Sequence, residues 1–498
     1  MKNQKKMSFK VLAFVLLAIV IVSCKKNANL EEFNDQASTF KQKGAKSFVG
    51  HPVGLQTNLR MYGYMETWGT SYAQYLDSIN LTQLTDLCIS FVNPDVNGNF
   101  NVRQDIIDAV PKAHLQGVRV HYSIGGGGGP AYWDNLITPA NRTQVIKNMM
   151  GVLNNYNFDG IDVDLEGARI SNNPANYNAF LIQLADSIHS YSKLVSIAIA
   201  RYQANQVTTA AYAKLDYLNA MIYDYQSGVA GPHSSFAQFQ YDFGIFSSKL
   251  PAAKINLGVP GYAYQYEGNT VITQVSIKSI LSQYPKAYAL NYQYANATKS
   301  WWYDGHPVLR QKVAYCLQQG VGGMMIWQMM HDPKDDESSL LKLMNFCAGN
   351  PAMAGFNPLV DYSFTAKNSN LPMEVAGASL NNGAGVQQNT WTNANNQKWF
   401  LAATNNEFKI TNKNSGKVLD EVDETASGQG VQFIQNTWHG GGNQRYRLVP
   451  NALGYYKVVN VASNRLASVF GASTTPGTKI VQWPDGNGDN QQFIIKRH

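Results

Sequence analysis

Short apolar runs recur along the chain from about residue 58, and longer segments between them have apolar residues three and four positions apart. Runs rich in branched aliphatic and aromatic residues are typical of strands, whereas the longer periodicity is typical of helices. Strands are predicted at Arg60–Tyr64, Leu87–Val92, Arg119–Ile124, Gly160–Leu165, Val195–Ala200, Tyr217–Tyr223, Ile255–Val259 and Gly323–Trp327. Helices are predicted between several of them, at Val102–His114, Asn141–Asn154, Tyr177–Tyr191 and Pro307–Gln319. Eight strand–helix units in about 290 residues predict an α/β fold, the (β/α)8 TIM barrel, with a doubly wound open sheet as the alternative.

The fourth predicted strand carries three acids on one face. Asp162, Asp164 and Glu166 alternate with branched aliphatic residues, and alternate residues of a strand point the same way. Buried carboxylates are costly unless they are paired or neutralised, so three on one face indicate a function. The structural alternatives are a half-exposed amphipathic strand and a loop that binds a cation through oxygen atoms.

Polar and aromatic residues also gather at the C-terminal ends of other predicted strands. The active site of a TIM barrel is built at this end of its strands. Each such residue alone is more often part of a core than of a site. The prediction therefore depends on their all lying at the same end of the predicted strands. They are Tyr64, Tyr223, Asp224, Tyr262 and Trp327.

Four acids of the fourth strand form the pattern D-x-x-D-x-D-x-E, namely Asp159, Asp162, Asp164 and Glu166. This pattern resembles the catalytic strand of family 18 glycoside hydrolases, which are chitinases and endo-β-N-acetylglucosaminidases. Further stretches resemble the third, sixth and eighth strands of that family: Ser123-Ile-Gly-Gly126, Met221-Ile-Tyr-Asp224 and Gly322-Gly-Met-Met-Ile-Trp327. The resemblance covers about residues 55–345, and Leu257-Gly-Val-Pro-Gly-Tyr262 favours the chitinase branch.

The resemblance implies a retaining mechanism in which a group of the substrate acts as the nucleophile. Most glycosidases use two carboxylates of the protein instead, and this family is an exception to that scheme. Glu166 would be the general acid, which needs a raised pKa to keep its proton near neutral pH. Asp164 would bind the acetamido N–H of the substrate, and Asp162 would share a proton with Asp164. Tyr223 would orient the acetamido carbonyl, and Trp327 would form the apolar floor under the sugar.

The resemblance leaves other residues with open roles. Tyr64, Asp224 and Tyr262 are candidates for substrate binding, although Asp224 could instead cap a helix. Asp159 falls on the opposite face or before the strand, so a structural role at the lower end of the barrel is expected. Trp68, Trp133 and Trp301 could stack on sugars, but each is more typical of a core or a rim.

Two segments of the barrel carry further expectations. The stretch from Asn256 to Trp301 is expected to be too short for an α+β insertion, which would leave a shallow cleft and favour endo action. Asp332, Asp335, Asp336 and Glu337 follow the eighth strand and are interpreted as a solvated loop.

The chain changes character after Cys347. Gly349–Pro358 is rich in Pro and Gly, and beyond it Gln397-Lys-Trp399, Gln444-Arg-Tyr446 and Gln491-Gln-Phe493 recur at equal spacing. Three such repeats resemble the ricin-type β-trefoil, an all-β carbohydrate-binding module. Sugar pockets are predicted first at Asp420 with Trp438 and Asn443, and second at Glu374 with Trp391 and Asn396. Ser468 occupies the matching place in the third repeat, and a trefoil without working sites is the alternative.

The N-terminus has the pattern of a secretory signal, with a basic start, an apolar stretch over Val11–Val22 and a small residue before the break. Ile21-Val-Ser-Cys24 resembles a bacterial lipobox, which implies lipidation of Cys24 and attachment to the outer membrane or cell surface. An uncleaved anchor or an ordinary signal peptide is the alternative. The predicted divisions are a signal at 1–24, a tether at 25–48, a catalytic barrel at 49–348, a linker at 349–360 and a trefoil at 361–498.

The composition limits the classes of partner and cofactor that are expected. A net charge of +7 over 498 residues is modest, and no basic run follows residue 26, so no nucleic-acid partner is expected. No metal or other cofactor is expected, because the chain has no H-E-x-x-H motif and its His residues do not cluster. Cys88 is expected to be a buried free thiol, whereas a Cys316–Cys347 bridge stays open. A monomer is expected.

Three functions remain open at this level. The first is a retaining endo-chitinase that cuts β-1,4 links between N-acetylglucosamine units. The second is an endo-β-N-acetylglucosaminidase that releases N-glycans, since both reactions use the acetamido group. The third is a surface lectin with an inactive barrel, which the presence of Glu166, Asp164 and Tyr223 disfavours.

Overall fold

The computed structural model describes residues 59–67, 69–335, 337–349, 356, 358–404, 407–422, 429–451 and 453–498. The predicted signal with Cys24, the tether at 25–48, Trp68 and Asp336 lie outside the described residues. Within the described part of the chain, no helix is both long and apolar enough to cross a membrane. The predicted domain boundaries stay predictions.

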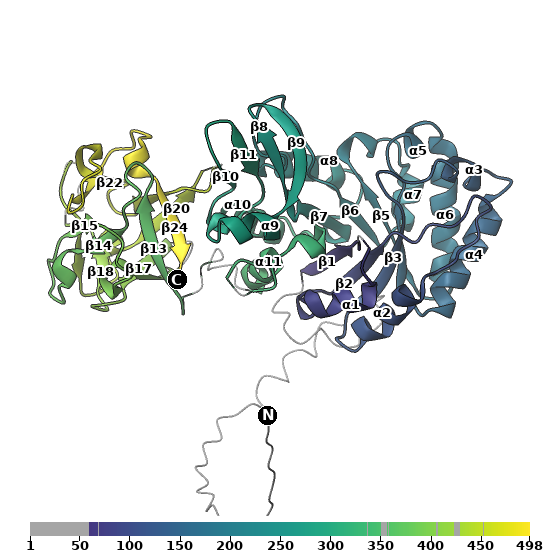
Figure 1. Cartoon of the computed structure of the whole chain (residues 1–498), viewed down its shortest axis with the longest axis horizontal. Helices are drawn as coiled ribbons and strands as arrows, with labels where there is room; N and C mark the ends of the chain where they lie inside the picture. The colour runs from purple at the N-terminus through teal and green to yellow at the C-terminus, as the bar shows by residue number, and fades with distance from the viewer. Residues whose placement is uncertain are drawn as a thin grey trace, which may run out of the picture. The chain divides into compact units, whose positions relative to one another are not determined.

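Parallel strands close into a barrel in the order β1-β12-β7-β6-β5-β4-β3-β2 (Figure 1). They are β1 Arg60–Met65, β2 Asp86–Ser90, β3 Arg119–Gly125, β4 Gly160–Asp164, β5 Leu194–Ile199, β6 Tyr217–Ala220, β7 Ile255–Pro260 and β12 Gly323–Trp327. All eight predicted strands are therefore present, and the open-sheet alternative is wrong. Closure leaves no sheet edge, so each strand pairs on both sides.

Helices surround the barrel strands in Figure 1. They are α1 Tyr72–Tyr75, α2 Gln104–His114, α3 Trp133–Leu136, α4 Arg142–Asn155, α5 Ala168–Ser171, α6 Pro174–Ser190, α7 Thr209–Lys214, α8 Phe236–Ser247, α10 His306–Gln318 and α11 Leu340–Gly349. Local signals set some of their starts: Pro174 opens α6, and the Ser235 side chain accepts the Gln238 N–H at the start of α8. The four predicted helices correspond to α2, α4, α6 and α10.

An antiparallel sheet is inserted after β7, so the expectation of too short a segment is wrong. Its order is β10-β11-β8-β9. The inserted elements are β8 Tyr262–Glu267, β9 Thr270–Ser276, α9 Ile277–Gln283, β10 Tyr292–Tyr294 and β11 Lys299–Trp302. The insertion needs few residues because its strands are short and a tight turn through Gly268, whose φ is +58°, connects two of them. The inference of a shallow cleft therefore loses its basis.

The acids after β12 also differ from expectation. Asp332 is buried, and its carboxylate accepts hydrogen bonds from Ser339 Oγ at 2.8 Å and from the Leu340 N–H at 2.7 Å. Asp335 accepts from the Glu337 and Ser338 N–H groups. The solvated-loop interpretation is therefore wrong for Asp332, because these oxygens satisfy the otherwise unpaired donors at the start of α11.

The cysteines of the described barrel are all buried and free. Cys88 is a free thiol, as predicted. Cys316 and Cys347, which sequence left undecided, are unbridged. Burial raises the pKa of both thiols, to about 12 for Cys347, so neither is a reactive thiolate at neutral pH.

The C-terminal region is a β-rich domain with three similar units. Its strands are β13 Asp361–Ala366, β14 Met373–Val375, β15 Val386–Gln388, β16 Trp399–Thr404, β17 Glu407–Asn412, β18 Val418–Asp420, β19 Ile434–Asn436, β20 Tyr446–Pro450, β21 Tyr456–Asn460, β22 Leu466–Val469, β23 Ile480–Trp483 and β24 Phe493–Arg497. Trp399, Tyr446 and Phe493 of the repeats are buried in one core. The repeated aromatic residue is therefore structural.

Candidate active site

A cavity of about 220 Å³ opens at the C-terminal end of the barrel strands. It contains most of the residues that the sequence singled out. Its lining consists of Tyr64, Phe91, Gly127, Asp164, Glu166, Ala198, Met221, Tyr223, Asp224, Tyr262, Gln274, Met325 and Trp327. Strand ends from around the barrel thus converge on one space, as the strand-end argument predicts.

Asp162 lies on β4 below the cavity and is fully buried. Its Oδ2 accepts hydrogen bonds from the hydroxyls of Tyr64 and Ser123, both at 2.8 Å. Its Oδ1 accepts from Ser196 Oγ at 2.6 Å and from Asn219 Nδ2 at 3.0 Å. Four donors therefore fill the acceptor sites of this carboxylate. Tyr64 lines the cavity with its ring, but its hydroxyl positions Asp162.

Asp164 is the last residue of β4 and is only 4% exposed. Its Oδ1 is buried and has no hydrogen-bond partner within the protein. Burial raises the pKa of this carboxyl well above its usual range, and the nearby charges of Glu166 and Asp162 raise it further. A buried acceptor without a partner is costly, so this oxygen is available to a ligand donor that enters the cavity.

Glu166 lies two residues beyond the end of β4 and faces the same cavity. Burial raises its pKa to about 7, and the negative charge of Asp224 adds to the shift. A Cβ at Gly127 would lie 3.1 Å from Glu166 Oε1, so glycine at this position leaves space beside the acid. The carboxyl therefore holds a proton near neutral pH in a site that a substrate can reach.

Tyr223 and Asp224 follow β6 at the cavity wall. The Tyr223 hydroxyl is 3.8 Å from Met325 Sδ, a weak contact that leaves it free to donate to a substrate oxygen. Asp224 accepts a 2.5 Å hydrogen bond from the Tyr262 hydroxyl, and its Oδ1 is 3.6 Å from Nδ1 of buried His233. Ser235 caps α8, the next helix along the described chain, so Asp224 is not its cap, and the helix-cap alternative is wrong.

Opposing effects set the charge of Asp224. Burial acts to raise its pKa, but hydrogen bonds from His233 and Tyr262 outweigh burial and lower it. Asp224 is therefore negative near Glu166, which explains its contribution to the raised pKa of that acid. His233 was not identified from sequence, since nothing in the chain pattern links it to the site.

Aromatic rings form the apolar side of the cavity. Trp327 stacks on Phe91, with ring centroids 5.9 Å apart, and contacts Tyr64 at 5.5 Å. Phe91 was missed, although it falls within the second predicted strand at its C-terminal end. Gln274 was also missed, because it comes from the inserted β9, which the sequence did not predict.

Other candidates lie elsewhere. Trp133 and Trp301 are buried among core residues and do not line the cavity. Asp159 precedes β4 and accepts the Val120 N–H at 2.8 Å, with His114 Nε2 at 2.7 Å. Within the described residues, no group of three or more His, Cys, Asp or Glu side chains could hold a metal ion.

The predicted acids of the trefoil are held by amides of their own repeats. Asp420 is buried and accepts from Asn443 Nδ2 at 3.0 Å and from Gln444 Nε2 at 2.6 Å. Glu374 is likewise buried and accepts from Gln397 Nε2 at 2.9 Å. The structure therefore brings each acid together with the glutamine that recurs at equal spacing in its own repeat.

Exposed tryptophans accompany these acids. Trp438 and Trp391 are each 39% exposed, which leaves ring surface for a ligand. The two rings differ in their neighbours: Trp391 stacks on His498 at 4.6 Å, whereas Lys409 Nζ lies 5.3 Å over Trp438. In the third repeat, Ser468 Oγ accepts from Asn490 in place of an acid.

The fold and the cavity define a TIM-barrel site with a protonated carboxyl beside a second buried acid, an arrangement suited to glycoside hydrolysis. A family model, "Glycosyl hydrolases family 18", matches residues 60–332, which is more than half of the chain. The chain therefore belongs to this family. A second model, "Ricin-type beta-trefoil lectin domain-like", matches three overlapping segments within residues 356–498.

Individual relatives agree with this assignment. The chain is 24% identical over 250 residues to Endochitinase 1 of Metarhizium robertsii, covering 40% of this chain and 58% of the relative. It is 25% identical over 261 residues to a chitinase-like effector of Moniliophthora perniciosa, covering 45% and 59%. The chain thus spans a little over half the length of these relatives.

A solved structure is also similar. It is the GH18 chitinase ChiB from the chitin utilization locus of Flavobacterium johnsoniae, with a TM-score of 0.51 and 26% identity. The match covers 58% of this chain and 93% of that chain.

Proposed function

We propose that this protein hydrolyses β-1,4 links between N-acetylglucosamine units, in chitin or chito-oligosaccharides, with retention of configuration. One observation carries the proposal: a buried, unpartnered Oδ1 of Asp164 lies in the same cavity as Glu166, whose pKa is about 7. An acetamido N–H supplies the donor that Asp164 lacks, and a glycosidic oxygen takes the proton that Glu166 holds.

The first half-reaction breaks the glycosidic bond. Glu166 donates its proton to the leaving oxygen, while the acetamido carbonyl oxygen of the substrate attacks C1 and closes an oxazolinium ring. Asp164 accepts the acetamido N–H and stabilises the positive charge that develops on the ring. The Tyr223 hydroxyl donates to the acetamido oxygen, and Trp327 packs against the apolar face of the sugar.

The second half-reaction restores the enzyme. Glu166, now a carboxylate, removes a proton from water, which attacks C1 from the face that the leaving group occupied. The oxazolinium ring opens, and the product keeps the β configuration. Because both displacements invert C1, the net outcome is retention.

We further propose that the trefoil binds the same polymer and raises its local concentration. Asp420, Asn443 and Trp438 supply a carboxylate, an amide and an exposed ring in one repeat, which suits a sugar with hydroxyls on its edge and C–H groups on its face. Trp438→Ala in the full chain should weaken binding to insoluble chitin several-fold while leaving hydrolysis of soluble oligosaccharides unchanged. Equal retention by the variant and the wild type would place the binding elsewhere.

The envelope location is proposed from the N-terminal sequence. Cleavage before Cys24 and lipidation of its thiol would tether the catalytic region outside the cytoplasm. Labelling of the full chain with a radioactive fatty acid in a bacterial host should mark the wild type and not Cys24→Ser. Labelling of both proteins would reject the lipobox.

Product analysis by mass spectrometry tests the activity. The protein without residues 1–24 would be incubated separately with chito-oligosaccharides and with a high-mannose glycoprotein. We expect short N-acetylglucosamine oligomers from the first and no cleavage of the second. Released glycan, with one N-acetylglucosamine left on the protein, would replace the proposal by endo-β-N-acetylglucosaminidase activity, and silence on both would favour a lectin.

A further inference from the structure

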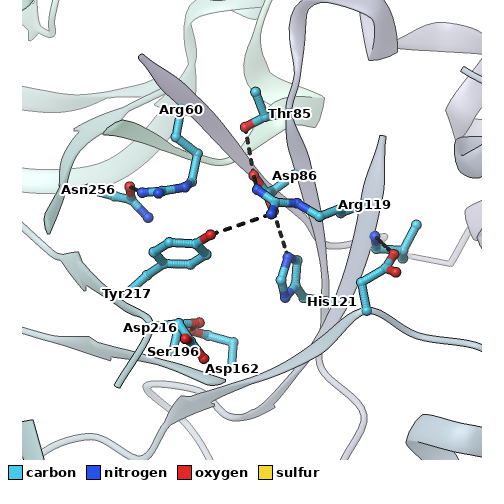
Figure 2. A network of polar contacts seen from close by, with 12 residues as sticks. Arg60, Thr85, Asp86, Arg119, His121, Asp162, Ser196, Asp216, Tyr217 and Asn256 are labelled. Carbon is cyan, nitrogen blue, oxygen red and sulfur yellow. Dashed lines mark hydrogen bonds and ion pairs between the residues drawn. The ribbon is translucent and has the colours of Figure 1, made fainter. Parts of the chain in front are cut away.

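A line of hydrogen-bonded side chains runs through the barrel from Asp162 to its floor. Asn219 Nδ2 on β6 donates to Asp162 Oδ1 at 3.0 Å, and Asn256 Nδ2 on β7 donates to Asn219 Oδ1 at 2.7 Å. Arg60 Nη1 on β1 then donates to Asn256 Oδ1 at 2.7 Å. Both asparagines are fully buried. Figure 2 shows Arg60 and Asn256 side by side at the floor, with Asp162 on the strand beyond Tyr217.

The line has a fixed direction, because its last member can only donate. A guanidinium has no acceptor, so the atom of Asn256 that faces Arg60 must be its carbonyl oxygen. The Asn256 amide nitrogen then faces Asn219 and requires an oxygen there. This turns the Asn219 amide nitrogen toward Asp162. The orientation of both amides, which their own shape leaves open, therefore follows from the charge at the floor.

The packing around the floor favours this arrangement. A Cβ at Gly323 would lie 2.2 Å from Asn256 Oδ1 and 2.7 Å from Arg60 Cβ, so glycine leaves the space in which the two side chains meet. The guanidinium of Arg60 also lies 3.5 Å from the centre of the Tyr217 ring, which holds it against one wall.

Asn219 differs from the other three donors to Asp162. Tyr64, Ser123 and Ser196 contribute hydroxyls, which can rotate and accept a proton instead of giving one. The amide nitrogen of Asn219 cannot accept. A proton on Asp162 Oδ1 would therefore face another hydrogen. A proton on Oδ2 would have to be accepted by Tyr64, whose hydroxyl oxygen already accepts from Asn219 Nδ2 at 2.9 Å, or by Ser123, whose own hydrogen would then lose its acceptor. The ionised carboxylate satisfies every neighbour.

We propose that Arg60, Asn256 and Asn219 form a directional relay that keeps Asp162 ionised, so that Asp164 is the acid of this pair on β4 that carries a proton. These three are positioning residues, since none of them lines the cavity. The inference rests on the proposed function, in which Asp164 accepts the acetamido N–H. A protonated Asp164 still accepts this N–H through its carbonyl oxygen, and the ionised Asp162 on the same face of β4 adds the negative charge that stabilises the oxazolinium ring.

Asp164 is the one neighbour of Asp162, among the described residues, that competes for this proton near neutral pH. Burial raises the pKa of the nearby phenols and of the Cys88 thiol, so these groups stay neutral. His121 lies on β3 but its Nε2 is 2.8 Å from Asp86. The titratable groups around Asp162 are Tyr62 and Tyr64 of β1, Cys88 of β2, His121 of β3, Asp164 of β4, Tyr177 of α6 and Tyr223 after β6.

Arg60→Met and Arg60→Lys form a matched pair for the test. Both lose the planar contact with Tyr217, but lysine still has only donors and preserves the direction of the relay. With Arg60→Met the amides can turn over, the proton moves to Asp162, and Asp164 becomes the negative neighbour of Glu166. The alkaline midpoint of kcat/KM on a chito-oligosaccharide should then rise by about half a pH unit to one unit, since a like charge raises the pKa of an acid.

Arg60→Lys should keep the wild-type midpoint, whereas Asn256→Asp should shift it as Arg60→Met does. The new carboxylate accepts from both Arg60 and Asn219, so it reverses the Asn219 amide. A merely structural role would lower kcat in these variants without moving the midpoint. An unmoved midpoint in Arg60→Met and Asn256→Asp, or equal shifts in Arg60→Met and Arg60→Lys, would overturn the relay.

Difference infrared spectroscopy separates failure of the relay from failure of the proposed function, because it needs no substrate. At pH 6, Glu166 and Asp332, whose pKa values are about 7, contribute carboxylic-acid C=O bands in every variant. The further band of the wild type, from the acid pair of β4, should be lost in Asp164→Asn and retained in Asp162→Asn. In the Asn256→Asp background, these two outcomes should exchange. A band lost in Asp162→Asn from the wild type would reject the relay, even if the protein hydrolyses chito-oligosaccharides. An inactive wild type with the expected bands would reject only the function.

Discussion

Buried carboxyl groups occupy both ends of the same barrel, and they differ in their partners rather than in their burial. At the floor, Asp86 on β2 is fully buried beside Arg119 Nη2 and His121 Nε2, each 2.8 Å away (Figure 2). At the C-terminal end, Asp164 is almost as buried, but its Oδ1 has no partner in the protein. Only the second acid is available to a ligand.

The two environments act in opposite directions on the pKa. Burial acts to raise the pKa of Asp86, but the charge of Arg119 and the hydrogen bond from His121 outweigh it and hold the pKa below its usual range. Nothing outweighs burial at Asp164, and neighbouring acids add to it. The partners of Asp86 therefore make it part of an ion pair at the floor of the barrel. The absence of such partners leaves Asp164 at the C-terminal end of the strands able to react, at a cost in stability.

Glu166→Gln should have the largest effect, because it removes the only proton donor of the proposed reaction. Turnover of chito-oligosaccharides should fall by about a thousandfold or more, while binding persists. Steady-state kinetics with a sensitive fluorogenic oligosaccharide would measure the loss, with circular dichroism as a check of folding. Residual wild-type activity would remove Glu166 from the role of general acid.

Arg119→Met tests the contribution of the ion pair at the floor of the barrel. It leaves Asp86 as a buried charge with one strong partner fewer, so the free energy of unfolding should fall by about 3–5 kcal/mol. Activity of the folded protein should stay near wild type, since Arg119 lies at the floor and is not among the residues that line the cavity. Urea unfolding of the full chain measures the change.

Arg103→Met is the matched control for the floor. Arg103 pairs with Asp105 at 2.7 Å, but its side chain is 56% exposed. Exposed pairs contribute little, so this substitution should change stability by less than about 1 kcal/mol. Equal losses in the two arginine variants would show that burial of the Asp86 pair has no special importance.

Stability should depend on pH through Glu166. Burial and Asp224 raise its native pKa to about 7, above the value of about 4.3 in an unfolded chain, so the native state binds this proton more tightly. Its contribution to stability is complete below about pH 4.3 and is lost as pH rises through about 7. Glu166→Gln has no such loss, and it should exceed the wild type by about 1–3 kcal/mol at pH 8 relative to pH 4.

Thermal unfolding of both proteins across pH 4 to pH 8 would measure this difference. The same titration should lower kcat above about pH 7, because the ionised Glu166 cannot donate. A constant difference between variant and wild type across this range would show that the native carboxyl is not destabilised when charged.

The sequence predicted the parts of this molecule that depend on periodicity. The eight strands follow from apolar runs, and the acids of β4 share a face because strand side chains alternate. Whether an acid has partners was not predictable, because those partners come from distant strands: Asp162 is held by Tyr64, Ser196 and Asn219. Asp332 was misread for the same reason, since its partners lie on the next helix.

The inserted sheet was missed for a different reason. Its strands are short and partly exposed, so their apolar pattern is weak, and the length of the segment was a poor guide to its content. Gln274 was missed for the same reason, because its position at the cavity depends on β9.

Asp159→Asn should give the smallest effect and is the most direct test of the comparison within one motif. Asp159 belongs to the same acidic pattern as Glu166 but lies at the start of β4, where it accepts from the Val120 N–H and contacts His114. Burial acts to raise its pKa, but these hydrogen bonds outweigh it and lower it. Asparagine keeps the oxygen that accepts from Val120 and loses the charge, so unfolding free energy should fall by about 1 kcal/mol.

Turnover in Asp159→Asn should stay within twofold of the wild type, measured under the same conditions as Glu166→Gln. The loss of stability should be confined to pH values above about 4, where the carboxylate is charged in the wild type, because a lowered native pKa adds stability only once the acid ionises. A large loss of turnover with little loss of stability would mean that the motif acts as one unit and that the two ends of β4 are not separate in function.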